Sequence, residues 1–233
     1  MYPRKLAKST KNTQCNLLKQ QLDRGENCWY YNARAFVSTV SSFITTIVKE
    51  AVVPMIYTVT LNPALDKTVE IPNLALDTVN RITKMRTDPG GKGINVSKVI
   101  AKLGGTSKAI GILAGNSGKA IQDALDGEGL AHNFRFVPGE TRTNLKVIDP
   151  ENHTNTDINE PGLTVSPADL DALLRDLLGM VREGDIVVLA GSLPQGAPQD
   201  TYRVWTAACR EKGARVCLDA DGVLLAEGLK AAP

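Results

Sequence analysis

The stretch Pro89-Gly90-Gly91-Lys92-Gly93-Ile94-Asn95-Val96-Ser97 carries the strongest structural signal in this sequence of 233 residues. Its glycines allow the backbone to approach a ligand closely, and the helix expected after them presents free N–H groups and a positive dipole end. Lys92 and Asn95 add a cation and an amide, which suit phosphate and hydroxyl groups. The spacings of a P-loop and of a G-x-G-x-x-G dinucleotide loop are both absent. The composition of this stretch leaves a ligand-binding loop and a simple turn equally open.

Strands and helices are expected to alternate on both sides of this stretch. Short apolar runs predict strands at Ile56–Leu61, Ser107–Leu113, Asp185–Ala190 and Ala214–Leu218. Helical spacing of apolar residues predicts helices at Ile94–Leu103, Gly118–Leu125, Pro167–Met180 (with Ser166 as N-cap), Thr201–Lys212 and Asp221–Leu229. Repeated strand–helix units indicate an α/β fold, a mostly parallel sheet flanked by helices on both faces.

Two stretches break this rhythm. Residues 67–86 and 143–159 alternate polar and apolar side chains as strands do, and neither contains a helical pattern. Antiparallel strands inserted into an α/β sheet often form a lid over the site at its carboxyl edge. We therefore expect a small β-sheet lid, and a pair of hairpins without a functional role is the alternative.

Further candidate residues follow predicted strands at the same edge. Asp66 comes after the first strand and could accept hydrogen bonds from sugar hydroxyls, or serve as an Asx-turn residue. Arg142 and Asn144 begin a lid stretch, and a guanidinium can grip a phosphate with two parallel hydrogen bonds, although a lone arginine is often only solvated. Ser192 follows the buried strand that ends near Ala190.

The bulk composition narrows the classes of function. A net charge of +2 with 5% aromatic residues argues against binding to nucleic acid or to an anionic membrane. With two histidines and no C-x-x-C spacing, a zinc site is not expected. Cys209 and Cys217 lie in apolar surroundings, which predicts buried thiols in a reducing cytosol; a disulfide is the less favoured alternative. Of these classes of function, binding or conversion of a small molecule remains.

Residues 1–54 differ from the rest of the chain. They are first polar and basic, and the apolar run at 35–48 is short for a membrane span and interrupted by hydroxyls. The run Met55-Ile-Tyr-Thr reads like the start of a domain that opens with a buried strand. Val48-Lys-Glu-Ala51 can be encoded by a purine-rich run that resembles a ribosome-binding site. We therefore expect 1–54 to be an N-terminal extension that is unstructured or arises from a wrongly assigned start.

Four motifs in order resemble those of the ribokinase-like (PfkB) carbohydrate kinases, and most of all the 1-phosphofructokinase and tagatose-6-phosphate kinase branch. They are Leu61-Asn-Pro-Ala-Leu-Asp66, Pro89-Gly-Gly-Lys-Gly-Ile-Asn-Val96, Thr141-Arg-Thr-Asn144 and Ala190-Gly-Ser-Leu-Pro194. The resemblance runs from Met55 to Pro233 without a gap. It implies a ribokinase-like fold with a β-sheet lid that often pairs two subunits.

The resemblance also implies a reaction, in which ATP with Mg²⁺ phosphorylates a ketose phosphate in the cytoplasm. Fructose 1-phosphate, giving fructose 1,6-bisphosphate, is the favoured substrate, and tagatose 6-phosphate and fructose 6-phosphate remain open. It assigns sugar hydroxyls to Asp66, the sugar pocket to Gly91, Asn95 and Asn144, and the substrate's phosphate to Arg142. Further implied members are Lys92 and Ser192 in the pocket, Arg81 on the lid as a second phosphate ligand, and Asp219 in the magnesium and water network.

The family's later motifs are missing from this sequence. A Lys-Pro-Asn segment, the nucleotide pocket and a Gly-Ala-Gly-Asp motif with the general base would follow Pro233 in the resemblance, and none occurs here. We therefore expect a partial kinase domain over residues 55–233 that is inactive by itself. A non-catalytic fragment that binds a sugar phosphate, or a gene fragment with no life as a protein, are the alternatives.

Overall fold

A computed structural model describes residues 53–233 of the chain. Two units divide the sequence, Met1–Val53 and Pro54–Pro233, and the structural account concerns the second. The expectation for residues 1–54 lies outside the described residues except at its last two positions.

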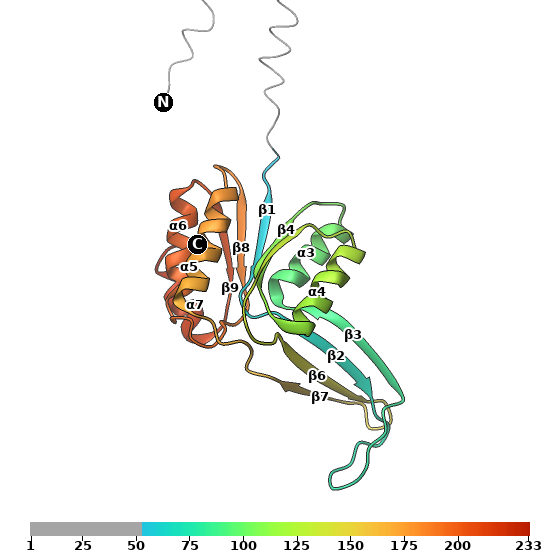
Figure 1. Ribbon diagram of the computed structural model, residues 1–233. Helices are drawn as coiled ribbons and strands as arrows, with labels where there is room; N and C mark the ends of the chain where they lie inside the picture. The colour runs from blue at the N-terminus through green and yellow to red at the C-terminus, as the bar shows by residue number, and fades with distance from the viewer. Residues whose placement is uncertain (1–52) are drawn as a thin grey trace, which may run out of the picture. The chain divides into compact units, whose positions relative to one another are not determined.

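The main sheet, sheet A, contains five parallel strands in the order β5-β4-β1-β8-β9. Its strands are β1 (Ile56–Thr60), β4 (Lys108–Leu113), β5 (His132–Phe136), β8 (Ile186–Ala190) and β9 (Arg215–Asp219). Helices α3 (Lys92–Lys102) and α4 (Gly115–Gly127) cover one face, and α5 (Pro167–Met180), α6 (Thr201–Glu211) and α7 (Gly222–Leu229) cover the other (Figure 1). The expected α/β fold with helices on both faces is confirmed.

A second sheet, sheet B, lies beyond the carboxyl ends of the central strands of sheet A (Figure 1). It consists of β2 (Ala64–Glu70), β3 (Lys84–Gly90), β6 (Arg142–Asp149) and β7 (Thr154–Asn159) in the order β3-β2-β6-β7. Strands β2 and β6 are parallel, and the two outer pairs are antiparallel. Asp66 lies inside β2 rather than in the turn that the sequence allowed. The glycine-rich stretch begins as the end of β3, where Pro89 is tolerated because β3 is an edge strand.

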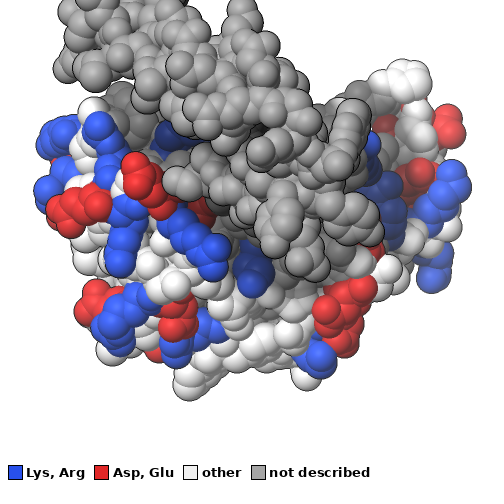
Figure 2. Space-filling view, turned by 90° about the horizontal axis from the view of Figure 1, so that it is seen from above, with Lys and Arg blue, Asp and Glu red and all other residues white. Residues whose placement is uncertain are grey.

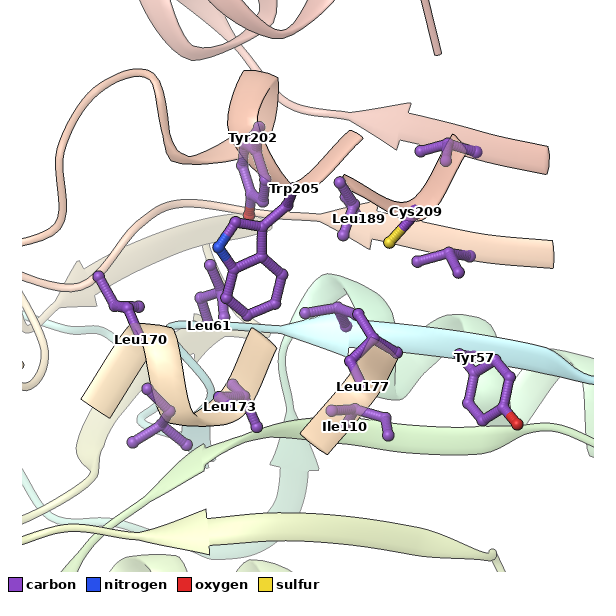
Figure 3. Packing of buried hydrophobic residues seen from close by; sticks show 14 of the residues in the cluster. Tyr57, Leu61, Ile110, Leu170, Leu173, Leu177, Leu189, Tyr202, Trp205 and Cys209 are labelled. Atoms are coloured by element: carbon purple, nitrogen blue, oxygen red, sulfur yellow. The ribbon is translucent and has the colours of Figure 1, made fainter. Parts of the chain in front are cut away.

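The largest core lies between sheet A and helices α5 and α6 (Figure 3). Helix α5 begins where Ser166 Oγ accepts a hydrogen bond from Asp169 N at 3.2 Å while Ser166 N donates to Asp169 Oδ2 at 3.1 Å, a capping box that fixes the predicted start. Leu170, Leu173 and Leu177 then follow at helical spacing and are buried against the sheet. Burial of each such leucine stabilises the fold by about 1.5–3 kcal/mol.

The two described cysteines have different environments. Cys209 is buried in α6, and burial raises the pKa of its thiol to about 11, so it stays protonated at neutral pH. Cys217 is exposed on β9, which corrects the prediction of a core thiol. The reason is that β9 is an edge strand of sheet A with only part of its surface covered by helices.

Figure 2 shows the end of the molecule at which the strands of sheet A begin. On the visible described part of this face, Lys and Arg side chains are interspersed with Asp and Glu. Within residues 53–233, no helix combines the length and apolar character needed to cross a membrane.

Candidate functional site

The glycines around the start of α3 first serve to bring this helix against the end of β1. Gly91 precedes the helix with a φ of 121°, and a Cβ there would lie 2.6 Å from Thr60 Cγ2. A Cβ at Gly93 would lie 2.5 Å from Thr60 Oγ1. The Thr60 hydroxyl accepts a hydrogen bond from Ile94 N at 3.0 Å, so it supplies the cap that a glycine cannot. The helix start is thereby fixed beside the carboxyl end of β1.

Three of the predicted site residues, Asp66, Asn95 and Asn144, line one polar pocket between α3 and sheet B. Its volume is about 520 Å³. Its lining consists of Asp66, Thr68, Arg86, Asp88, Pro89, Asn95, Lys98, Asn144, Lys146, Ile148, Asp157 and Asn159. The pocket has the size and the polar lining that a hydroxyl-rich small molecule requires.

Asp66 and Asn144 form the hydrogen-bonded centre of this pocket. They are direct partners across β2 and β6, and Asn144 Nδ2 donates to Asp66 Oδ1 at 3.0 Å. Asn144 Oδ1 has no hydrogen-bond partner among the described residues. The Asp66 carboxylate lies against Gly90, where an added Cβ would come within 2.1 Å of Oδ2. Gly90 is therefore required for Asp66 to occupy this position.

Arg142 is the first residue of β6, as expected, and its side chain is engaged by the backbone. Its Nη1 donates to Glu160 O and its Nη2 to Asn62 O, each at 3.1 Å. Burial lowers the pKa of Arg142, and the negative charges of Asp66 and Glu160 oppose that shift. Nε has no partner among residues 53–233. Arg142 does not line the pocket, and its role in binding phosphate remains a prediction.

Ser192 lies at the end of β8, within reach of the loop that follows β1. Asn62 Nδ2 donates to Ser192 Oγ at 3.2 Å and to Leu193 O at 3.3 Å. The buried Tyr202 hydroxyl donates to Gly191 O at 3.0 Å and anchors the same turn from α6. Ser192 is exposed and does not line the pocket.

Lys92 and Asp219 form an ion pair with each other, and neither lines the pocket. Lys92 Nζ lies 3.0 Å from Asp219 Oδ1 and 3.3 Å from Asp221 Oδ2. The hydrogen bond to Asp219, with a smaller contribution from Asp221, raises the pKa of Lys92. Mg²⁺ is commonly held by one or two carboxylates together with water and phosphate oxygens, so Asp219 and Asp221 fit such an ion. No group of three or more His, Cys, Asp or Glu side chains suited to a metal occurs in the described part of the chain.

Arg81 lies apart from the other predicted site residues. It is exposed in the loop between β2 and β3, beyond the pair Glu70 and Lys84 that closes the ladder of these strands. It does not line the pocket. Its contact with a phosphate therefore stays a prediction.

Several pocket residues were not singled out from the sequence, notably Arg86, Lys98, Lys146 and Asp157. One signal could have found Lys146. It follows Asn144 by two residues in a strand, and such residues share a face. Lys98 likewise follows Asn95 by three residues on α3, the spacing of helical neighbours.

The sequence matches a family model described as pfkB family carbohydrate kinase over residues 59–231. The chain belongs to this family. Among its PfkB relatives, the 1-phosphofructokinase of Rhodobacter capsulatus is 40% identical over 179 residues, which are 76% of this chain and 57% of the relative. That of Xanthomonas campestris is 43% identical over 178 residues, which are 76% of this chain and 55% of the relative. The chain thus spans little more than half the length of these curated relatives.

Three solved structures show the same fold. A possible 1-phosphofructokinase from Thermotoga maritima is 36% identical, with a TM-score of 0.69 over 76% of this chain and 57% of that one. Phosphofructokinase-2 from Escherichia coli in complex with substrates and products is 29% identical, with a TM-score of 0.73 over the same shares, 76% and 57%. Arabidopsis thaliana ribokinase, at 23% identity and a TM-score of 0.54 over 72% of this chain and 54% of that one, shares the fold alone. The ribokinase-like architecture is confirmed.

Proposed function

We propose that this chain carries the sugar-binding part of a kinase that transfers a phosphoryl group from ATP to a ketose phosphate. The favoured substrate is fructose 1-phosphate, and the product is fructose 1,6-bisphosphate. The observation that carries the proposal is the convergence of Asp66, Asn95 and Asn144 on one polar pocket beside the glycine-rich start of α3. The 1-phosphofructokinases among the curated relatives support the choice of sugar.

Each pocket residue has its own role in binding the sugar. The Asp66 carboxylate accepts hydrogen bonds from sugar hydroxyls, and the amides of Asn95 and Asn144 donate to or accept from the same sugar. Gly91 keeps the start of α3, and with it Asn95, close to the end of β1. ATP would supply the phosphoryl group and Mg²⁺ would balance charge on its phosphates, with Asp219 and Asp221 as carboxylates able to hold the ion through water.

A second substrate is favoured by one relative. Phosphofructokinase-2 from Escherichia coli has been solved in complex with fructose-6-phosphate, and it is 30% identical to this chain with a TM-score of 0.71. Fructose 6-phosphate is therefore the first alternative, and tagatose 6-phosphate, suggested by the motif resemblance, is the second. A non-catalytic role in binding a sugar phosphate is the alternative from a different class.

The proposal is tested on the purified 233-residue chain by a coupled kinase assay and by calorimetric titration. Because this sequence holds no Gly-Ala-Gly-Asp motif, we expect binding of fructose 1-phosphate without turnover in the presence of ATP and Mg²⁺. Asp66→Asn should weaken sugar binding by about tenfold, since it removes a charged acceptor. Asp77→Asn, in an exposed turn of the β2–β3 loop, is the matched control.

Either of two results would contradict this account. Clear turnover would place a general base within these residues, and no binding of any ketose phosphate would remove the proposed function altogether.

Sheet B further supports an association of two copies through the lid. Exposed apolar side chains gather on the β2–β3 loop and on the two edge strands of sheet B. They are Leu76, Val79, Ile82, Met85 and Ile158. Apolar groups concentrated on one small element mark an interaction surface more often than isolated ones do. We therefore propose a homodimer that buries this part of the lid.

A further inference from the structure

We infer that Glu140 is a positioning residue for the sugar pocket, because its carboxylate fixes the crossing of the chain from sheet A into β6 and thereby the place of Asn144. Glu140 does not line the pocket, so it acts through Asn144 rather than by touching a ligand. The inference rests on the proposed function, which it extends to a residue outside the binding site.

The pocket has two walls that belong to different layers of the fold. Asn95 stands on α3, which packs against β1 of sheet A, whereas Asp66 and Asn144 stand on strands of sheet B. The distance between these walls depends on the segments in which the chain crosses from one sheet to the other. One such crossing, residues 137–141, leads from β5 directly into the strand that carries Asn144 (Figure 1). A residue that fixes this crossing therefore fixes one wall of the pocket.

Glu140 joins this crossing to the first turn of α4. Asn116 N donates a hydrogen bond to Glu140 Oε2 at 3.1 Å, and Ser117 N donates to Glu140 Oε1 at 2.6 Å. These are two of the N–H groups that a helix leaves without internal partners at its start. The backbone N–H of Ser117 is the main cause that lowers the pKa of Glu140, and the positive end of the helix dipole favours the same charge. Glu140 is therefore a carboxylate at neutral pH, held through both of its oxygens.

The contact of Glu140 with α4 differs from an ordinary helix cap. A cap usually comes from the residue directly before the helix, whereas these hydrogen bonds join positions 24 and 23 residues apart. The first residue of the helix, Gly115, has a φ of 61°, and a Cβ there would lie 2.5 Å from Glu140 Cδ. A side chain at this position would displace the carboxylate. The contact thus ties two distant segments together and depends on a glycine that admits it.

Thr141 extends this contact to the next residue of the crossing. Thr141 is buried, its N donates to Ala114 O at 3.0 Å, and its Oγ1 accepts from Ala114 N at 2.8 Å. Strand β6 begins at the following residue, Arg142, and Asn144 comes two residues later. Rigid elements pass on displacements of their ends. A shift of the crossing at Glu140 therefore moves Asn144 relative to the wall formed by α3.

Calorimetric titration with fructose 1-phosphate and thermal melts of the 233-residue chain test the inference. Glu140→Gln keeps the size of the side chain but turns one acceptor oxygen into an N–H donor that faces a backbone N–H group. It should weaken binding of fructose 1-phosphate by about fivefold and lower the melting temperature by about 2–4 °C.

Asp169→Asn is the matched control, because Asp169 is also a carboxylate at the start of a helix. Its partner is Ser166, three residues away in the same helix start, so it ties no distant segments together. Asp169→Asn should lower the melting temperature by a similar amount and leave the affinity for fructose 1-phosphate unchanged.

A double-mutant cycle with Asn144→Ala separates a positioning role from a merely structural one. Because Glu140 acts through Asn144, Glu140→Gln should cause no further loss of affinity in the Asn144→Ala background. An unchanged affinity of the single variant Glu140→Gln, or losses that add in the double variant, would overturn the inference while the proposed function stands.

Amide hydrogen exchange gives a readout that needs no ligand. Glu140→Gln should increase exchange in β6, and Asp169→Asn should not. Equal exchange of β6 in the wild type and in Glu140→Gln would also overturn the inference. A wild-type chain that binds no ketose phosphate would overturn the proposed function, and with it the role of Glu140 in sugar binding, whatever the exchange of β6.

Discussion

Thr60 caps helix α3 although it lies 34 residues before Ile94 in the chain. Helices usually take this hydroxyl from the residue that directly precedes them. Here that residue is Gly91, whose positive φ and close approach to Thr60 exclude a side chain. Thr60 can therefore cap the helix only because Gly91 has no side chain.

Substitution of Gly91 tests this contact. Gly91→Ala should lower the free energy of unfolding by about 1–3 kcal/mol, because alanine is strained at this φ and its Cβ would meet Thr60 Cγ2. Gly127→Ala, at the end of α4 with nothing within 4 Å of the added Cβ, should raise that free energy by about 0.4–1 kcal/mol. Urea unfolding of both variants makes the comparison, and similar effects of the two substitutions would refute the steric explanation.

At the same scale, the sequence indicated the pocket residues Asp66 and Asn144 better than it indicated Lys146. Asp66 and Asn144 stand in motifs beside predicted strand ends, and both were expected in one site. Lys146 stands within an alternating strand, where a lysine usually belongs to a solvated face. Its spacing of two residues from Asn144 on the same strand is the local signal for its place in the pocket, whereas the parallel pairing of β2 and β6 that completes the pocket has no local pattern.

Among the elements, the β2–β3 loop contacts sheet B through the carboxylate of Asp149, at the end of β6. Asp149 accepts hydrogen bonds from Asn73 N at 3.0 Å and Leu74 N at 2.8 Å, which belong to this loop. It also accepts from Asn152 Nδ2 at 2.8 Å, in the turn between β6 and β7. Leu74 packs on Val69 and Val147, which form the apolar side of the sheet. Asp149 thus ties two loops to one strand end.

This arrangement predicts that the stability of sheet B is sensitive to acid. The hydrogen bond from Asn152, followed by those from backbone N–H groups, lowers the pKa of Asp149 well below its usual range. Because the folded-state pKa is depressed, the stabilisation is present above the unfolded value of about 4 and is lost as the pH falls below it. Asp149→Asn should therefore increase hydrogen exchange in sheet B at pH 7, and the difference from the wild type should shrink below about pH 4.

Asp157→Asn, in the exposed strand β7, serves as the control carboxylate for this experiment. Equal exchange in wild type and Asp149→Asn at pH 7 would show that the loop is held by other contacts.

The elements that could be predicted were those with complete local signals. Helix α5 has its proline, its capping box and its leucine spacing within one stretch, and it spans Pro167–Met180 as expected. Strand β5 was missed because His132–Phe136 mixes polar and aromatic residues at the edge of sheet A. The extent of β3 was missed because Pro89 and Gly90 favour a loop locally, and an edge position in sheet B overrides that preference.

At the scale of the whole molecule, the exposed apolar side chains of sheet B predict self-association. Met85 and Ile158, 60% and 57% exposed, lie on the two edge strands. The double variant Met85→Lys and Ile158→Lys should sediment as a monomer at concentrations at which the wild type forms a dimer, because paired lysines resist burial. Leu103→Lys, at the C-terminal end of α3 and 83% exposed, should leave the dimer unchanged. A wild-type chain that stays monomeric at all concentrations would contradict the proposed lid interface.

The contact between Asp66 and Asn144 joins positions 78 residues apart. Between them the chain builds β3, α3, β4, α4 and β5, which include two strands of sheet A and the two helices on one of its faces. Contacts between such distant segments cost more loop-closure entropy than contacts between near ones. We therefore expect β2 to pair with β6 late in folding. On a ribosome, β2 would emerge early and stand without its parallel neighbour while most of these units form. The two side chains at the centre of the pocket therefore meet late, and a folding chain acquires its ligand site only after much of its scaffold is in place.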